Sequence, residues 1–556
     1  MKFNFDTLLY VAFGVSSANA AQPAGHNPTK APTCRNVVCH GHTWPPSPRS
    51  SIHPASPPEC CGDDPRLIGM AANGDTRGTY IFSTTARSDS KERAPPPPPP
   101  YIPLLAVSGW NNTEQTQRIN VSTISNMRII ALGLMGLQCV ASMRFAMYVD
   151  EYHTSGLPGS NQTQGITHAI MAFAQSTLFN SNSPPQFTPF ESVSTMRSRF
   201  SPGTKLMIAI GGWGDSSGFS TAAKDETSRN QYAKNVATMV NQLGFDGVDI
   251  DWEYPGGNGQ DYKTTPNSAK VSEITTYPLF LQALRSALGP NKLLSIAVPG
   301  KKEDMIAFTN TTGPQIWPSV DMVNIMSYDL MNRRNNVTMH HTSVVDSFNT
   351  VQAYRDIGLP GNKTNLGMAY YAKWFETDPN DEKECEDQPI GCKVVVMENA
   401  DGSDNGKSGS LTFEKSVMSA PPTNLKTSVD GTCGFDKGTK CPSGSCCSQY
   451  GNCGTTDDFC QAGCLSDYGT CKGISITDSW RRAQENAKLD DVMGGEYYFD
   501  DEVNVFWTWD TADMIARKFT DIVDKLGLGG VMAWSLGEDT LAWEHLGAMQ
   551  KGVASR

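Results

Sequence analysis

Eight short apolar runs, separated by helix-like segments, constrain the fold of this chain more than any other feature. The runs lie at residues 144–149, 167–174, 205–210, 247–252, 293–298, 322–326, 365–370 and 530–534. Segments between them, such as 230–243 and 277–288, carry apolar residues near helical spacing. Strands that alternate with helices form parallel sheets, either doubly wound or closed into a barrel. The number eight favours the barrel, so we predict an α/β fold of the (β/α)8 or TIM type.

The fourth run carries a row of acidic residues at its carboxyl end. Asp249, Asp251 and Glu253 share one face because side chains alternate along a strand, while Ile250 and Trp252 point the other way. Three carboxyl groups inside a barrel repel one another, which raises at least one pKa and suits a general acid. The alternatives are a solvated acidic turn and a divalent-metal site, but no His or further acidic cluster stands at ligand spacing. We predict a catalytic site.

Charge and hydropathy exclude several classes of partner. The net charge is −12 and the chain has no block of Lys or Arg, which argues against a nucleic-acid partner. No apolar run reaches the roughly 20 residues that a membrane-spanning helix needs. We therefore expect neither nucleic acid nor membrane as a partner.

The first 142 residues differ from the rest of the chain. Residues 1–20 resemble a secretory signal peptide, and 21–142 form a proline-rich segment that we expect to be disordered, since 17 of the 35 prolines precede residue 127. A second signal-like pattern at 127–142 suggests Met127 as an alternative start. Either start gives the chain an export signal.

The cysteines agree with export. Eight of the 15 cysteines fall within residues 433–471 and include the adjacent pair Cys446 and Cys447. This density, with abundant Gly and no ordered CxxC pairs, favours a disulfide scaffold over a metal site.

Several motifs together resemble glycoside hydrolase family 18, the chitinases. Asp246, Asp249, Asp251 and Glu253 match its D-x-x-D-x-D-x-E signature. In chain order, further motifs resemble the third, sixth and last strands of that family: Ile210-Gly211-Gly212-Trp213, Met326-Ser327-Tyr328-Asp329 and Gly530-Val531-Met532-Ala533-Trp534. The resemblance covers about 410 residues, and we assign 143–552 to a catalytic barrel.

The resemblance implies a role for each matching residue and no metal or cofactor. Glu253 would protonate the leaving oxygen, Asp251 would orient the substrate acetamido group, and Asp249 would share a proton with Asp251. Tyr328 would donate a hydrogen bond to the acetamido oxygen. The matching positions for substrate binding are Asp246, Trp213, Met326, Asp329, Tyr371 and Trp534. Ala209 stands where the family has Ser, so one hydrogen bond that supports the carboxylates is expected to be missing, and Lys373 stands where many relatives have Arg.

An insertion at 376–510 separates the seventh and eighth strands, and Cys385 is predicted to pair with Cys392 inside it. Within the insertion, 431–472 resembles a hevein-type (type 1) chitin-binding module. That resemblance implies the disulfides Cys433–Cys447, Cys441–Cys453, Cys446–Cys460 and Cys464–Cys471. It also implies sugar binding by Ser448, Tyr450 and Phe459, while Asn452 replaces an aromatic residue of the family.

These features together predict a secreted, extracellular chitinase of fungal type that cleaves β-1,4 linkages, with an endo preference. Its partners would be chitin and N-acetylglucosamine oligomers, and we expect a monomer; retention at the cell wall stays open. One alternative is a non-catalytic chitin-binding lectin, against which the retained Glu253 argues. The other is an endo-β-N-acetylglucosaminidase acting on glycoprotein glycans, against which the chitin-binding module argues.

Overall fold

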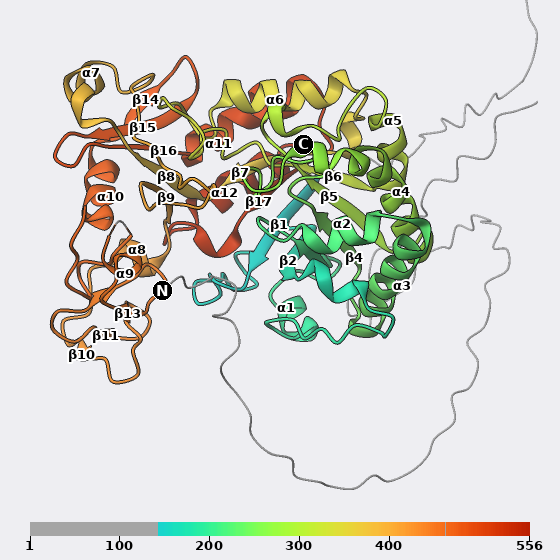
Figure 1. Ribbon diagram of the computed structural model, residues 1–556, viewed down its shortest axis with the longest axis horizontal. Helices are drawn as coiled ribbons and strands as arrows, with labels where there is room; N and C mark the ends of the chain where they lie inside the picture. The colour runs from blue at the N-terminus through green and yellow to red at the C-terminus, as the bar shows by residue number, and fades with distance from the viewer. Residues whose placement is uncertain (1–142, 462) are drawn as a thin grey trace, which may run out of the picture. The chain divides into compact units, whose positions relative to one another are not determined.

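A computed structural model describes residues 143–461 and 463–556, which contain a closed barrel of eight parallel strands (Figure 1). The predicted signal peptides and the proline-rich segment lie outside the described residues. The barrel strands are β1 (Arg144–Asp150), β2 (His168–Ala174), β3 (Lys205–Gly211), β4 (Gly247–Asp251), β5 (Leu293–Val298), β6 (Met322–Ile325), β7 (Thr364–Ala369) and β17 (Gly530–Trp534). The strands are adjacent in chain order, and β17 closes the ring between β7 and β1. The predicted fold is confirmed.

Helices surround the barrel and cover its outer face. They are α1 (Val193–Ser198), α2 (Ser217–Ala223), α3 (Glu226–Leu243), α4 (Val271–Leu288), α5 (Gly313–Ile316), α6 (Val344–Asp356), α11 (Ala512–Lys518) and α12 (Glu544–Ala554). Helix α3 has a clear capping residue at each end. The Asp225 side chain accepts a hydrogen bond from the Ser228 N–H, and Gly244 ends the helix at φ 80°, in the left-handed region that glycine tolerates best.

Side-chain alternation divides the core of the barrel into two layers. On β1, Phe145 and Met147 belong to the large apolar cluster between strands and helices, whereas Tyr148 belongs to the cluster inside the barrel. On β4, Val248 and Ile250 face the helices, so the intervening Asp249 and Asp251 face inward. Fully buried strands of this kind are typical of parallel barrels covered by helices.

Two glycines at the end of β3 allow a close approach to β4. Gly211 has φ 105°, and a Cβ atom there would lie 2.3 Å from the Asp251 carbonyl oxygen. The Gly212 N–H donates a 2.9 Å hydrogen bond to that same oxygen. No other residue fits this position without displacing Asp251, which explains the paired glycines of the third-strand motif.

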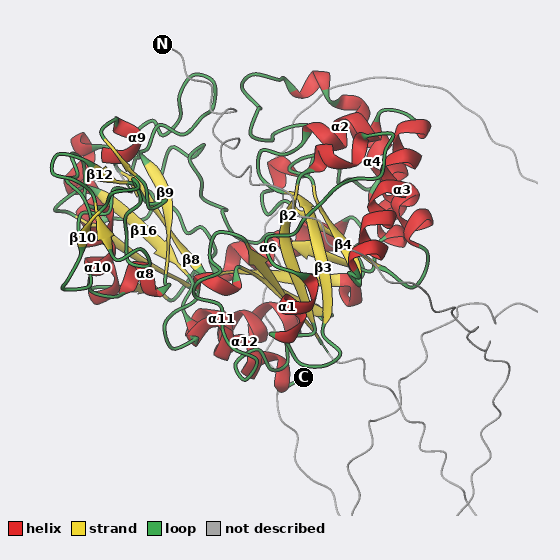
Figure 2. Ribbon diagram, turned by 90° about the horizontal axis from the view of Figure 1, so that it is seen from below, coloured by secondary structure: helices red, strands yellow, loops and turns green. Residues whose placement is uncertain are grey.

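The insertion leaves the barrel at the carboxyl end of β7 and forms its own antiparallel sheet, which Figure 2 shows beside the barrel strands. The sheet has the order β14 (Lys488–Asp490), β15 (Gly495–Asp500), β16 (Val505–Trp509), β8 (Tyr371–Glu376) and β9 (Ser408–Thr412), and the helices of the insertion are α7 (Glu382–Asp387), α8 (Lys415–Met418) and α10 (Ile476–Glu485). Trp480 of α10 stacks on Trp507 of β16 at 4.7 Å between ring centroids, so α10 packs on the sheet.

The small module has almost no apolar core and is held by disulfides. Its elements are β11 (Thr439–Lys440), β12 (Cys446–Cys447), β13 (Cys453–Gly454) and α9 (Asp457–Cys460), and β10 (Lys426–Thr427), which precedes the module, pairs with β11. Its disulfides are Cys433–Cys447, Cys441–Cys453, Cys446–Cys460 and Cys464–Cys471, the four expected pairs, and Cys385 is also bonded to Cys392. Short strands and one helical turn cannot bury enough surface on their own, so these cross-links maintain the module.

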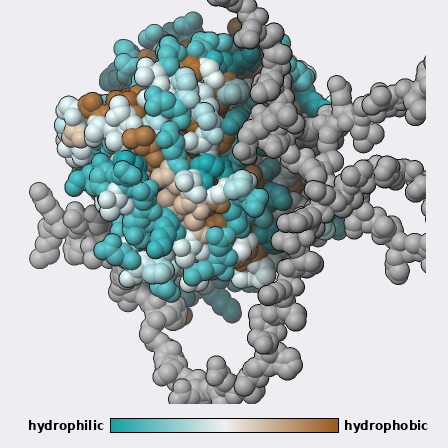
Figure 3. Space-filling view, turned by 90° about the vertical axis from the view of Figure 1, so that its right-hand side faces the viewer, coloured by the Kyte–Doolittle hydropathy of each residue, from teal (hydrophilic) through white to brown (hydrophobic). Residues whose placement is uncertain are grey.

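The described surface visible in Figure 3 is mostly hydrophilic, and its hydrophobic residues lie in small separate groups. Among the described residues, no helix combines the length and apolar character that crossing a membrane requires.

Candidate active site

Three carboxyl groups line the inner face of β4 and the residues that follow it. Asp249 is fully buried, and Asp251 and Glu253 are 4% and 8% exposed. Trp252 packs among the outer apolar residues and stacks on Phe219 at 5.5 Å between ring centroids. Because Trp252 points outward, the adjacent Asp251 and Glu253 point toward the barrel interior. The predicted arrangement of the three side chains on one face therefore follows from the observed packing.

Asp249 receives hydrogen bonds from side chains of three other barrel strands, β1, β5 and β6. The Tyr148 hydroxyl donates to Oδ2 at 2.8 Å, and the Ser295 hydroxyl donates to Oδ1 at 2.5 Å. The Asn324 amide donates to Oδ1 at 3.2 Å. Ala209, directly opposite Asp249 on β3, has no donor to offer. The bond expected from a Ser at that position is absent, and three other donors satisfy the buried carboxyl group.

Burial raises the pKa of all three carboxyl groups, because removing charge from water is costly. It raises the pKa of Asp249 to about 6 even though its hydrogen bonds act in the opposite direction. Burial, followed by the charges of Glu253 and Asp249, raises the pKa of Asp251 well above its ordinary value. Burial also raises the pKa of Glu253 to about 7, helped by the charges of Asp329 and Asp304 and opposed by Arg334. Glu253 thus holds a transferable proton near neutral pH.

Asp251 has a buried oxygen that no protein group satisfies. Its Oδ1 lacks a hydrogen-bond partner, although the residue lies between two other carboxyl groups. An unsatisfied buried oxygen is costly unless it carries a proton or meets a donor on a bound molecule. Asp251 is therefore suited to accept a hydrogen bond from a substrate.

Aromatic rings form the floor beside these carboxyl groups. Trp534, the last residue of β17, stacks on Phe173 at 5.4 Å and lies 5.5 Å from the ring of Tyr148. Met326 and Trp534 both pack against the inner cluster, to which Tyr328 belongs. The Trp534 indole is only partly covered, which leaves a flat apolar face of the kind on which a sugar ring packs.

Asp329 follows the sixth strand and is held by two side chains of β8. The Tyr371 hydroxyl donates to its Oδ1 at 2.9 Å, and Lys373 Nζ lies 3.5 Å from the same oxygen. Burial alone would raise the pKa of Asp329, but the charge of Lys373 and the hydrogen bonds of His341 and Tyr371 hold it well below the usual range. Asp329 is therefore an anion, and Lys373 supplies the positive charge at this side of the site.

The hydroxyl of Tyr328 has only a weak protein acceptor. It lies 3.9 Å from the Met532 sulfur, and the ring is 8% exposed at the edge of the inner cluster. A thioether is a poor acceptor, so this hydroxyl is free to donate to a stronger one.

Trp213 follows the paired glycines of β3 and is 44% exposed. The Arg334 guanidinium lies 5.4 Å from its ring centroid and 4.2 Å from that of Tyr262. Arg334 also lies 3.6 Å from Asp304. This side of the site therefore combines an aromatic face with a cation whose charge acts on Glu253.

Asp246 lies apart from the other predicted site residues. It precedes β4, at the opposite end of the strand from Asp251, and its Oδ2 accepts hydrogen bonds from Arg197 and from the Leu206 N–H, both at 2.8 Å. The interpretation of Asp246 as a substrate-binding residue is wrong, because its side chain joins α1 and β3 at the amino end of the barrel.

In the small module, Tyr450 is 79% exposed and Phe459 is partly covered. Ser448 is buried, and its hydroxyl accepts a 3.4 Å hydrogen bond from the Asn452 N–H. The Asn452 side chain donates to the Tyr450 carbonyl and is exposed, so it stabilises the turn that presents Tyr450.

Sequence reasoning did not identify the three donors to Asp249. Tyr148, Ser295 and Asn324 come from strands far apart in the chain, yet each occupies an inward position of a predicted strand. A polar residue that faces the interior of a barrel needs a hydrogen-bond partner there. The polar residues at inward positions of the predicted strands were therefore the signal that could have identified these donors.

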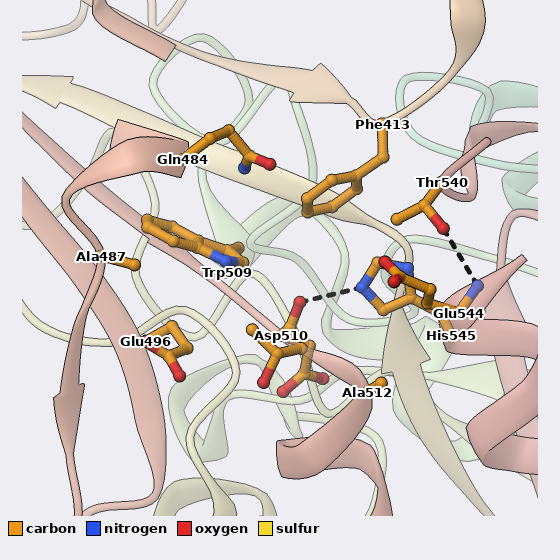
Figure 4. Close-up of a pocket in the computed structure, with 11 residues that line it drawn as sticks. Phe413, Gln484, Ala487, Glu496, Trp509, Asp510, Ala512, Thr540, Glu544 and His545 are labelled. Atoms are coloured by element: carbon orange, nitrogen blue, oxygen red, sulfur yellow. Dashed lines mark hydrogen bonds between the residues drawn. The ribbon is translucent and has the colours of Figure 1, made fainter. Parts of the chain in front are cut away.

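A pocket of about 200 Å³ lies elsewhere, where β16, α10 and α12 meet (Figure 4). His545 is one of its polar lining residues, and both of its ring nitrogens have partners, Asp539 at 2.7 Å and the Asp510 carbonyl at 3.0 Å. These contacts are internal to the fold. Within the described part of the chain, the one triad at metal-ligand distance is Cys433, Cys441 and Cys447, whose sulfurs all belong to disulfides.

Comparison with known proteins agrees with this geometry. A family model described as glycosyl hydrolases family 18 matches residues 144–539. Chitinase 1 of Aphanocladium album is 32% identical over 192 residues, and endochitinase 1 of Metarhizium robertsii is 31% identical over 183 residues. Each match covers 31% of this chain and 42% of the relative, so the chain aligns with less than half the length of these curated proteins. The crystal structure of catalytic domain 2 of the Ostrinia furnacalis group II chitinase superposes with a TM-score of 0.51 at 18% identity, covering 74% of this chain and 97% of that one. The last similarity concerns the fold.

Tyr148→Phe is expected to lower kcat about tenfold or more on a soluble N-acetylglucosamine oligosaccharide, the substrate class predicted from the sequence. The change removes a donor to a buried carboxyl group, and such bonds are worth about 1.5–3 kcal/mol. KM should change less than kcat, because Tyr148 acts through Asp249. Tyr354→Phe is the matched control, since Tyr354 donates to the Pro299 carbonyl at 2.8 Å. Equal kcat values for the two variants would contradict the role of Tyr148.

The pH profile of kcat/KM should fall as pH rises through about 7, because Glu253 must be protonated to act as an acid. Arg334→Gln removes a positive charge that lowers this pKa, so the descending limb should move to higher pH. Asp304→Asn removes a negative charge that raises it, so the limb should move to lower pH. Shifts of the same sign in both variants would show that another group controls the limb.

Proposed function

Because this chain belongs to family 18 of the glycosyl hydrolases, we propose that it is a chitinase that hydrolyses β-1,4 linkages between N-acetylglucosamine units with retention of configuration. The nucleophile is the substrate's own acetamido carbonyl, a known exception to the scheme with two catalytic carboxylates. The observation that supports this most is the buried row of Asp249, Asp251 and Glu253, in which Glu253 has a pKa of about 7.

In the first step Glu253 gives its proton to the glycosidic oxygen as the bond to the anomeric carbon breaks. The acetamido oxygen attacks that carbon from the other side and forms an oxazolinium ion. The free Oδ1 of Asp251 accepts the acetamido N–H and stabilises the positive charge that develops there. The weakly engaged hydroxyl of Tyr328 donates to the acetamido oxygen and orients it for attack.

In the second step Glu253, now a carboxylate, takes a proton from water while the water oxygen bonds to the anomeric carbon. Opening of the oxazolinium returns the β configuration and regenerates the acetamido group. Asp249 shares a proton with Asp251 as the charge on Glu253 alternates, and its three hydrogen bonds allow it to be ionised in the interior.

The sugar itself lies on Trp534 and is oriented by Asp329. The indole face of Trp534 supports the apolar face of the ring, and Asp329 accepts hydrogen bonds from its hydroxyl groups. Lys373 and Tyr371 keep Asp329 ionised and in place.

The inserted module favours chitin over a glycoprotein glycan as the substrate. Its disulfide pattern and exposed Tyr450 suit binding of N-acetylglucosamine polymers, and binding to a polymer concentrates the enzyme on its substrate. The five disulfides of the described residues support export to an oxidising compartment and an extracellular site of action. We also propose an endo mode of cleavage, inside the polymer chain. The lengths of the first products released from chitin test this mode.

Glu253→Gln should reduce hydrolysis of chitin oligosaccharides at least about a hundredfold, because it removes the general acid while keeping the shape of the site. Products of the parent protein should appear first as β anomers by NMR, and the variant should still bind the oligosaccharide. A near-normal rate in Glu253→Gln would refute the assignment of the acid. A folded parent protein that binds chitin without cleaving it would be a lectin.

Tyr450→Ala should weaken retention on insoluble chitin about tenfold, which corresponds to about 1.4 kcal/mol of binding free energy. On chitotriose, which is short enough to occupy the cleft alone, kcat/KM should fall less than twofold. Val429→Ala is the control, because Val429 is fully exposed two residues before the module begins. Equal losses on insoluble chitin and on chitotriose would contradict a separate sugar-binding role for the module.

A further inference from the structure

The loop after β1 carries an exposed tyrosine at the rim of the barrel where the catalytic carboxyl groups lie. Tyr152 is 78% exposed, two residues beyond the end of β1. Among the described residues, Tyr152 and Tyr450, at 78% and 79% exposure, are the two most exposed aromatic side chains. Neither the core nor the proposed mechanism uses this ring.

The loop is attached firmly to the floor of the site. Asp150 Oδ1 accepts hydrogen bonds from the N–H groups of Tyr152 at 2.8 Å and His153 at 3.0 Å, and it also lies 2.8 Å from His153 Nδ1. The other oxygen of Asp150 accepts from the hydroxyl of Ser535, the residue after Trp534. The backbone of Tyr152 is therefore held in relation to the Trp534 platform.

The same loop contacts the small module. The Ser155 hydroxyl donates a 3.1 Å hydrogen bond to Asp436 of the module. In Figure 1 the teal loop after β1 extends toward the orange segment that contains β13 and α9. The module and the rim of the barrel are thus neighbours.

Two further contacts hold the module in one orientation. Lys415 of α8 lies 5.3 Å from the ring centroid of Phe435, and Arg481 of α10 pairs with Asp467 at 2.6 Å. Arg481 also pairs with Asp478 of its own helix at 2.8 Å, which fixes the guanidinium. The module is therefore docked at three places, on the β1 loop, α8 and α10, unlike a domain on a flexible tether.

Docking places the turn that carries the exposed tyrosine of the module next to the module segment that the β1 loop contacts. The N–H of Cys433 donates a 2.8 Å hydrogen bond to the carbonyl of Gly451, the residue after Tyr450, and Cys433 lies three residues before Asp436, which the β1 loop contacts. Both rings stay open to solvent, at 78% and 79% exposure. Two exposed aromatic faces, one at the cleft and one on the docked module, offer stacking positions for successive parts of a sugar chain.

We propose that Tyr152 and Tyr450 form one continuous binding surface between the cleft and the module, along which a single chain of β-1,4-linked N-acetylglucosamine lies. The module then extends the cleft instead of acting as a separate anchor. Because the docked module is already oriented, a chain bound in the cleft meets the second site at little extra entropic cost. This inference rests on the proposed function and adds to it a preference for long chains.

Calorimetric titration of Glu253→Gln with soluble chitin oligosaccharides of increasing length, from the trimer to the octamer, tests the proposal. Trimers should bind two per protein, one in the cleft and one on the module. Above a threshold length, one oligosaccharide per protein should bind, at least about tenfold more tightly than the trimer. Adding Tyr152→Ala or Tyr450→Ala should each remove most of this gain, whereas Tyr152→Trp, which keeps an aromatic face, should preserve it.

Val492→Ala serves as the control, because Val492 is 82% exposed on the insertion and outside the proposed surface. Two octamers per protein, or equal affinities for trimer and octamer, would overturn the continuous surface. Hydrolysis by the parent protein is measured separately. If the parent protein cleaves oligosaccharides but two octamers bind per protein, the proposed function stands and the continuous surface is refuted. If one octamer binds per protein but the parent protein cleaves nothing, the continuous surface stands and the proposed function is refuted.

Discussion

The site depends on keeping three carboxyl groups in the interior of a barrel, where water cannot solvate them. Burial alone would protonate all three, and a fully protonated row could not exchange protons during a reaction. Hydrogen bonds from Tyr148, Ser295 and Asn324 oppose this effect at Asp249. The balance differs along the row, so Glu253 holds a proton near neutral pH while Asp249 titrates lower. The environment of each carboxyl group, more than its identity, assigns its role.

The closed barrel is what makes this balance possible. Its parallel strands all end at one rim, so donors from β1, β5 and β6 converge on β4 without any loop having to position them. The same rim receives the start of the insertion and the loop that carries Tyr152. A site built on strand ends is rigid, whereas the neighbouring loops and the module supply contacts that extend it.

Much of this architecture was predictable because it follows local patterns. The eight strands and the inward face of the fourth agree with the sequence-based predictions, since apolar runs and side-chain alternation are properties of short segments. The disulfide pairs of the module are those that its resemblance to hevein-type modules implies. Asp246 is a residue for which the motif alone led to a wrong prediction. It belongs to the same motif as Asp249, yet it lies at the amino end of the strand and binds Arg197, because position along a strand decides which rim a side chain reaches.

The sequence by itself determined that acidic residues of β4 face a barrel interior, that Glu253 stands at the end of that row, and that eight cysteines maintain a small module. Only the tertiary structure decided which hydrogen bonds offset the burial of these carboxyl groups, since Tyr148 lies 101 residues from Asp249 in the chain. It also decided that Lys373 pairs with Asp329 and that the module docks on the loop that carries Tyr152. Hydrogen bonds and ion pairs between distant segments leave no periodic trace in a sequence, because each depends on where the whole fold places two side chains.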